Sequence, residues 1–164
     1  YVDDMLSILG KEKKGVWSDD NISFFEPSCG HGNIVMPIYK KRLEAFYKKA
    51  VSPNTKNPAL YAVANALNTL WAVDIESKNV NQCRTRVLIF TLEFLKDKFK
   101  FDNDYSVIKK NIEFMAHVLC AINWHIHENE TLSSLSTNTN GHASAGLTRS
   151  GSKWFTQNLS LIHI

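Results

Sequence analysis

Apolar positions along the chain alternate between helical spacing and short continuous runs. Helical spacing over 2–9, with Gly10 as a C-terminal stop, predicts a short opening helix. The apolar run at 22–25 is too short for a helix and predicts a buried strand. The run at 70–73, which ends on Asp74, predicts a second buried strand.

Helical patterns fill the segments between these strands. Helical spacing resumes at 35–49, although Pro37 lies in the first turns and leaves the helix start undefined. The Ala-rich segment 59–67 predicts a short helix before the second strand.

Two further helices are expected after the second strand. Asn79 with Gln82 resembles a capping pair for a long helix with apolar positions over 80–94. A charged turn at 102–104 separates it from another helix over 108–122. The resulting order, helix, strand, helix, short helix, strand, helix, helix, is typical of the start of an α/β fold with a parallel sheet.

The composition indicates the general class of protein. The chain has 164 residues, 44% hydrophobic and 21% charged, which is typical of one soluble globular domain. The net charge is +3, and the basic clusters at 11–14 and 40–49 are more typical of solvated helix faces than of phosphate contacts. No apolar run approaches the ~20 residues that span a bilayer.

Three separated cysteines, Cys29, Cys83 and Cys120, argue against a disulfide framework, so we expect a cytoplasmic protein. Because the chain starts at Tyr1 and not at Met, we expect the natural beginning to be missing. From 133 to 164 periodicity disappears, which predicts a loop or a disordered, truncated tail behind a domain at 1–132.

The turn after the first predicted strand has the chemistry of a nucleotide site. Gly30 and Gly32 let a ligand approach the backbone, and the following helix offers free N–H groups. A tight turn without a ligand is the alternative. Val35 stands where a dinucleotide-binding motif needs its third glycine, and no Gly-Lys-Ser/Thr follows, so NAD, FAD and a P-loop are disfavoured.

The sequence of this turn resembles a motif of one protein family. Residues 24–33, Phe-Phe-Glu-Pro-Ser-Cys-Gly-His-Gly-Asn, resemble the first motif of amino-methylating DNA methyltransferases, Asp/Glu-Pro-x-Cys/Ala-Gly-x-Gly-Asn. Residues 71–75, with Asn-Val at 79–80 and Cys-Arg at 83–84, are similar to the second motif. Residues 2–6 are similar to the helix before the first motif. His31 departs from the more frequent Thr or Ser.

The resemblance implies an incomplete Rossmann-like class I methyltransferase fold that binds S-adenosyl-L-methionine. Glu26 would lie near the methionine amino group, Asp74 would accept the ribose hydroxyls, and Ile75 would pack on the adenine. Glu76 is the alternative ribose acceptor. The cofactor-binding residues implied are Glu26, Pro27, Ser28, Cys29, Gly30, His31, Gly32, Asn33, Asp74 and Ile75.

The motif that holds the target base in this family, (N/D)PP(Y/F), is absent because no two of the four prolines are adjacent. No catalytic residue is therefore named. The parent protein is expected to methylate adenine in DNA, in a restriction-modification system or a phage, with most DNA contacts outside this sequence and with a restriction or specificity subunit as a partner. Cytosine-amino, RNA or protein methylation and a non-catalytic binding module are the alternatives.

A cluster near the end of the last predicted helix raises the question of a metal. His117 and Cys120 would share a helix face, but His125 and His127 cannot both join them, and no Cys-x-x-Cys supports zinc. We expect no metal here, with or without Glu130. Trp124 could face nucleic acid, but such a residue is more often a core or interface anchor.

Overall fold

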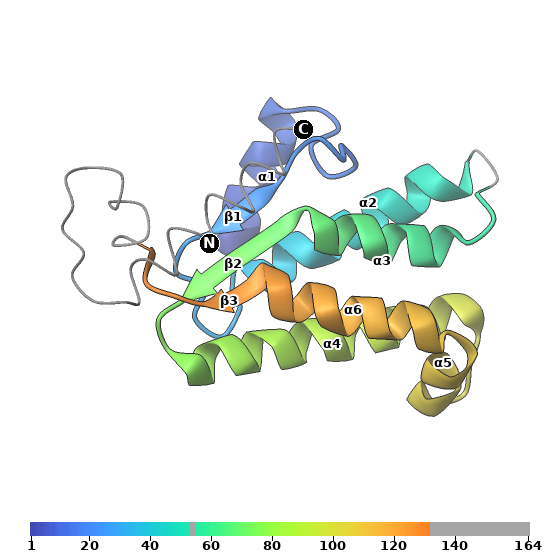
Figure 1. Cartoon of the computed structure of the whole chain (residues 1–164). Helices are drawn as coiled ribbons and strands as arrows, with labels where there is room; N and C mark the ends of the chain where they lie inside the picture. The colour runs from blue at the N-terminus through green and yellow to red at the C-terminus, as the bar shows by residue number, and fades with distance from the viewer. Residues whose placement is uncertain (53–54, 132–164) are drawn as a thin grey trace.

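The computed structural model describes residues 1–52 and 55–131, and it has a three-stranded parallel sheet flanked by helices (Figure 1). The strands are β1 (Phe24–Glu26), β2 (Leu70–Asp74) and β3 (Ile126–Glu128), in the order β1-β2-β3. The α/β class with a parallel sheet is confirmed. The tail expected at 133–164 lies outside the described residues.

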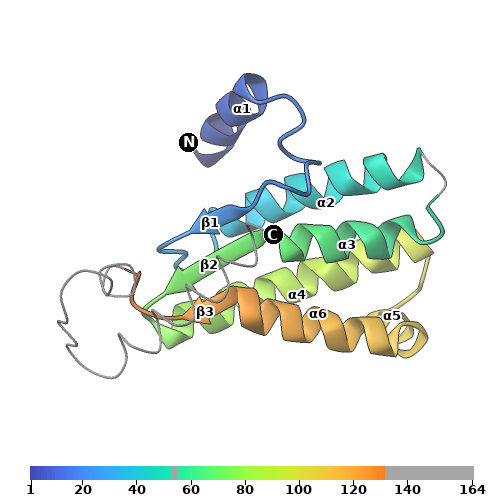
Figure 2. The ribbon, with the colours of Figure 1, turned by 45° about the horizontal axis from the view of Figure 1, so that its top comes forward.

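The helices are longer than the strands they accompany. Their bounds are α1 (Val2–Glu12), α2 (Val35–Val51), α3 (Pro58–Asn68), α4 (Ser77–Phe99), α5 (Asp104–Lys110) and α6 (Ile112–His125). Figures 1 and 2 show α2, α3, α4 and α6 running side by side, away from the carboxyl ends of the strands. The first turn of α4 lies beside the carboxyl end of β2, because α4 begins three residues after Asp74.

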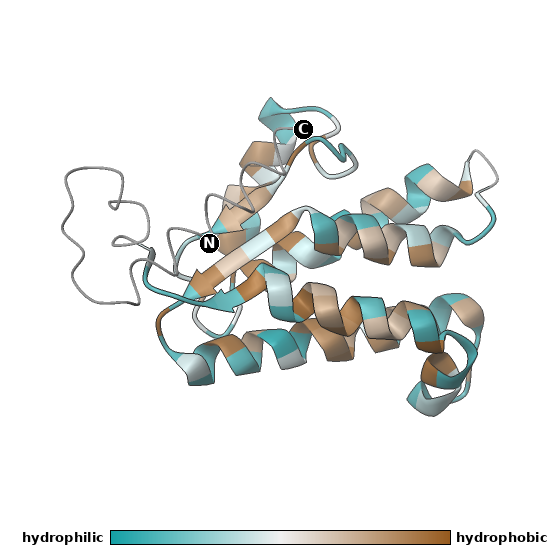
Figure 3. Ribbon diagram, in the orientation of Figure 1, coloured by the Kyte–Doolittle hydropathy of each residue, from teal (hydrophilic) through white to brown (hydrophobic). Residues whose placement is uncertain are grey.

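The core lies between the sheet and these helices. All five residues of β2 are buried, as expected for a central parallel strand, and Figure 3 shows hydrophobic positions along it in brown. Register pairs Phe25 with Trp71 and Ala72 with Ile126, so β2 is hydrogen-bonded on both sides. The central strand thus fixes where its last residue, Asp74, stands.

The expectation that the basic cluster at 40–49 is solvated is wrong for Arg42. Its guanidinium is fully buried and donates to the carbonyls of Val16, Asp19 and Ile22 and to the Thr69 hydroxyl, at 2.6 to 3.0 Å. These bonds tie the loop before β1 to the end of α3. Burial lowers the pKa of Arg42 to about 10, so the side chain still carries its charge at neutral pH.

Two helix boundaries were predicted wrongly. Helix α1 continues through Gly10 to Glu12, and Gly10 is placed where an added Cβ would lie 2.8 Å from the Trp17 indole nitrogen. This glycine makes room for Trp17 and does not end the helix. The single helix expected over 108–122 is two helices, because Asn111 between them has the non-helical angles φ −132° and ψ 37°.

Two further expectations need correction at the ends of β2 and α6. Asn79 does not cap α4, which begins at Ser77; its side-chain amide donates to Asp74 Oδ1 at 3.3 Å instead. The sheet also has a third strand, β3, that the sequence pattern did not predict. Only Ile126 of its three residues is buried, so the strand has no apolar run.

Candidate functional site

The carboxyl ends of β1 and β2 meet because the two strands are adjacent and parallel. The turn that follows Glu26 crosses over the end of β2. In this turn the Cys29 N–H donates to the Val73 carbonyl at 2.8 Å, and the Gly30 N–H donates to Asp74 Oδ2 at 2.8 Å. The glycine turn and Asp74, far apart in the sequence, therefore form one site. Such an edge is where open parallel sheets bind ligands.

Both glycines of the turn adopt backbone conformations that other residues rarely take. Gly30 has φ +52° and Gly32 has φ +92°. A Cβ on Gly32 would lie 2.8 Å from the Cys83 sulfur, so this glycine permits close packing of the turn on α4. Around the corresponding position of Gly30, no described atom beyond its two neighbouring residues lies within 4 Å, so a ligand can approach the backbone there.

Asp74 is an ionised hydrogen-bond acceptor with little exposed surface. Burial would raise the pKa of its carboxyl, but hydrogen bonds from the Glu76 and Gly30 N–H groups and the Asn79 amide offset burial and hold the pKa below its ordinary value. A carboxylate can accept about four hydrogen bonds. Three are already used, so roughly one acceptor position remains for a ligand.

Two buried cysteines form the floor under the turn. Cys29 lies in the turn and Cys83 in α4. The hydrogen bond with the Cys83 thiol, together with burial, raises the pKa of Cys29, which stays a neutral thiol. The Cys29 sulfur also lies 3.4 Å from the Gly30 carbonyl oxygen. These sulfurs pack and orient the turn.

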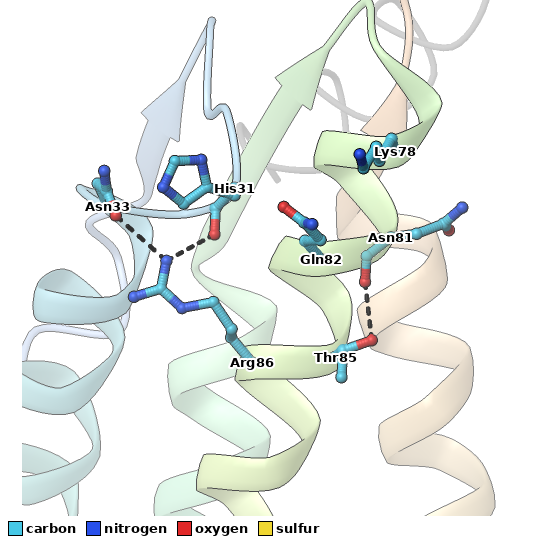
Figure 4. A pocket seen from close by; sticks show the side chains of 7 residues that line it. All are labelled: His31, Asn33, Lys78, Asn81, Gln82, Thr85 and Arg86. Atoms are coloured by element: carbon cyan, nitrogen blue, oxygen red, sulfur yellow. Dashed lines mark hydrogen bonds between the residues drawn. The ribbon is translucent and has the colours of Figure 1, made fainter.

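A polar groove that sequence reasoning missed adjoins the same turn. Arg86 of α4 reaches across to it, donating from Nη1 to the His31 carbonyl at 2.7 Å and to Asn33 Oδ1 at 3.2 Å (Figure 4). The groove has a volume of about 920 Å³ and is lined by His31, Asn33, Lys78, Asn81, Gln82, Thr85 and Arg86. Arg86 lies three residues after Cys83, but nothing in the apolar pattern distinguishes it from a solvated helix residue.

The remaining residues implied by the resemblance lie around this edge but contact other groups. Glu26 accepts a hydrogen bond from the Ser28 N–H at 3.2 Å, and the Pro27 carbonyl accepts one from the Thr131 hydroxyl at 2.6 Å. Ile75 is 69% exposed directly after Asp74. An exposed apolar side chain beside a polar edge can form one wall of a binding site.

The histidines and cysteine considered for a metal do not converge. His125 is buried, stacks on Trp71 with ring centroids 4.1 Å apart, and donates from Nδ1 to the Leu67 carbonyl at 2.6 Å. His117 and Cys120 are exposed on α6. Within residues 1–52 and 55–131, no three His, Cys, Asp or Glu side chains are grouped as metal ligands. Trp124 is 53% exposed, so it is not a core residue.

Comparison with known proteins adds no relative: neither a family model, nor a curated protein, nor a solved structure matches the chain. None of the described helices is long and apolar enough to cross a membrane. Any function must therefore be argued from the geometry of this edge and from the motifs that form it.

Proposed function

We propose that the turn at 26–33 and Asp74 bind S-adenosyl-L-methionine, and that the chain is the cofactor-binding part of a class I methyltransferase. The contact between the Gly30 N–H and the Asp74 carboxylate carries this proposal, because it joins a glycine turn and an acid at the ends of neighbouring parallel strands. A nucleoside-containing ligand needs both: a backbone it can approach closely and an anionic acceptor for its ribose.

The residues present fit the three parts of the cofactor. The open side of Gly30 suits the methionine part, and the Glu26 carboxylate at the same edge suits its ammonium group. Asp74 is the acceptor for the ribose hydroxyls. The exposed Ile75 supplies an apolar surface for the adenine. When bound, the cofactor supplies an electrophilic methyl group.

Asp74 has too few free acceptor positions to bind both ribose hydroxyls without a change in its present hydrogen bonds. Two ribose hydroxyls need two acceptors, but about one position is free. The second hydroxyl must displace either the Gly30 N–H or the Asn79 amide, or else use the neighbouring Glu76. We infer that the Asn79 amide gives way, because its 3.3 Å bond is the longest of the three.

The acceptor of the methyl group is proposed on the motifs alone. The segments 24–33 and 71–84 resemble those of DNA methyltransferases that act on the exocyclic amino group of adenine. Chemistry on that group requires holding a base outside the helix. The sequence lacks the Pro-Pro-aromatic motif for this step, so the rivals are an RNA or protein methyltransferase and a non-catalytic module with the same cofactor-binding fold.

A ligand panel tests the cofactor assignment. Isothermal titration of the full chain with S-adenosylmethionine, S-adenosylhomocysteine, NAD and ATP should give saturable heats for the first two only. NAD lacks an amino acid to pair with Glu26, and its pyrophosphate needs the third glycine that Val35 replaces. Tighter binding of NAD or ATP than of S-adenosylmethionine would reject the assignment.

A further inference from the structure

The groove beside the glycine turn is lined by polar and cationic side chains. Its seven lining residues include the cations Lys78 and Arg86 and the neutral polar side chains of Asn33, Asn81, Gln82 and Thr85, and no carboxylate (Figure 4). It opens between the turn and the first three turns of α4, on the helix side of the sheet edge. Its lining includes neither Asp74 nor Ile75.

The two cations of the groove carry unneutralised charge. Within the described residues Lys78 and Arg86 form no ion pair, and neither do most of the other lysines; only Lys49, Lys96, Lys98 and Lys100 pair with an aspartate. Arg86 contacts a carbonyl and an amide oxygen, which hold its position and leave its charge intact. A pair of unpaired cations in one groove favours an anionic ligand.

Lys78 stands at a position where its charge is unfavourable for the helix. It is the second residue of α4, whose first turn contains no acidic residue. The N-terminal end of a helix carries a partial positive charge, which a lysine repels and an anion stabilises. Glu76 at the N-cap and the Asp74 carboxylate offset part of this potential, so the positive charge of the groove comes from Lys78 and Arg86.

The donors that face the groove suit phosphate oxygens. Arg86 uses Nη1 for the turn, and its Nη2 and Nε make no hydrogen bond within the described part of the chain. The Gln82 amide projects from α4 toward the turn, whereas the Asn81 side chain projects from the other side of the helix (Figure 4). A planar guanidinium with a neighbouring amide can donate to phosphate oxygens.

We propose that this groove binds a phosphodiester group of a nucleic-acid backbone, with Lys78 and Arg86 as the charged contacts. The groove is open and, at about 920 Å³, far larger than a single phosphate group, which suits a continuous strand. Arg86 is bonded to His31 and Asn33, so the bound backbone would pass directly beside the cofactor site. The identification of this nucleic acid as DNA rests on the proposed function, whereas the recognition of phosphate rests on the groove alone.

Charge reversal at Lys78 tests the groove without disturbing the turn, which Lys78 does not contact. Glutamate is favoured in the first turn of a helix, so Lys78→Glu should fold at least as well as the wild type. Lys110→Glu, on exposed α5 at the opposite end of α4, is the matched control. Binding of the full chain to a short fluorescein-labelled DNA duplex is followed by anisotropy between about 50 and 200 mM salt.

The expected result is a loss of about tenfold or more in duplex affinity for Lys78→Glu, with the salt slope reduced by about one, and little change for Lys110→Glu. Arg86→Lys, which keeps the charge, should bind better than Arg86→Gln. Equal losses in Lys78→Glu and Lys110→Glu, or no duplex binding by the wild type, would overturn the proposal. So would binding of inorganic phosphate alone, which would assign the groove to a small anion.

The cofactor titration separates this proposal from the proposed function. Lys78→Glu should keep the wild-type affinity for S-adenosylmethionine. If the wild type binds no cofactor but the duplex result holds, the methyltransferase assignment fails and the groove stands. If cofactor binds and the duplex result fails, only the groove is rejected.

Discussion

The Gly30 backbone N–H donates to Asp74 Oδ2 at 2.8 Å, and this bond joins the turn after β1 to the end of β2. The two residues are 44 positions apart, so only the parallel pairing of the strands brings them together. Around this bond the structure arranges an ionised carboxylate, an accessible backbone and, on the other side of the turn, a cationic groove. Substitutions at and around the turn can test how the fold holds this arrangement and what it binds.

Substitution of Gly32 by alanine should destabilise the fold and the turn together. The new Cβ would lie 2.8 Å from the Cys83 sulfur at a φ of +92°, so either the turn or α4 must shift. We expect a loss of about 2–4 kcal/mol in the free energy of unfolding, from left-handed strain and overpacking. Urea denaturation followed by circular dichroism measures it.

Gly15→Ala is the matched control, because Gly15 has a similar φ of +80° and an added Cβ would meet nothing within 4 Å. It carries the conformational strain without the clash. A loss of the same size in both variants would show that close packing on Cys83 contributes nothing.

Arg42→Lys should cost about 2–4 kcal/mol of unfolding free energy, although it keeps the charge. The guanidinium donates to four acceptors in different directions, and an ammonium with three donors on a shorter group cannot reach them all. Arg84→Lys is the control, since Arg84 is only partly buried and bonds two carbonyls. Thermal and urea unfolding should show a clearly smaller loss for Arg84→Lys; equal losses would contradict the role of Arg42.

His125 should make the fold sensitive to mild acid. Burial lowers the pKa of His125 below 6.5, so the unfolded chain binds the proton more readily than the folded chain. The unfolding free energy should therefore fall as pH drops below about 6.5, and it should be constant with respect to this group at higher pH. Urea unfolding across this range should give a shallower decline for His125→Gln. An unchanged decline in that variant would assign the acid sensitivity to other groups, such as His127, whose pKa burial also lowers.

The sequence predicted the parts of the fold that carry a strong apolar pattern. Strand β2 was predicted to end at Asp74 because a compact apolar run stops at a charged residue. Strand β3 was missed because its residues, Ile126 to Glu128, include one buried side chain and follow α6 without a break. A short strand that is defined only by its hydrogen bonds to a neighbouring strand has no apolar run by which the sequence could predict it.

In the candidate site, the residues at the ends of the strands were predictable from the sequence, and the polar residues of α4 were not. The apolar pattern predicted parallel strands that end at the glycine turn and at Asp74, and the family resemblance assigned both to one cofactor site. The role of Asn79 was not predictable, because an amide near a helix start is equally typical of a cap. Arg86 and its groove were missed for a related reason: polar residues on an exposed helix face form no pattern until the facing turn is known.

The chain alone should transfer no methyl group, even if it binds the cofactor. It has no Pro-Pro-aromatic motif to hold a base, and binding one reactant without positioning the other forgoes most of the rate acceleration. The assay is transfer of tritiated methyl groups to mixed bacterial DNA, with a Gly30→Asp, Gly32→Asp double variant as the background. Transfer above that background would contradict this expectation.

The most direct test of the account is the affinity of the chain for S-adenosylmethionine with and without the Asp74 carboxylate. Isothermal titration of the wild type, Asp74→Ala and the control Asp104→Ala, in which an exposed acid far from the edge is removed, decides it. We expect saturable binding to the wild type, weakening by about 1–3 kcal/mol in Asp74→Ala, and no change in Asp104→Ala. Wild-type binding that Asp74→Ala leaves unaltered, or no binding by a folded wild-type chain, would contradict the account.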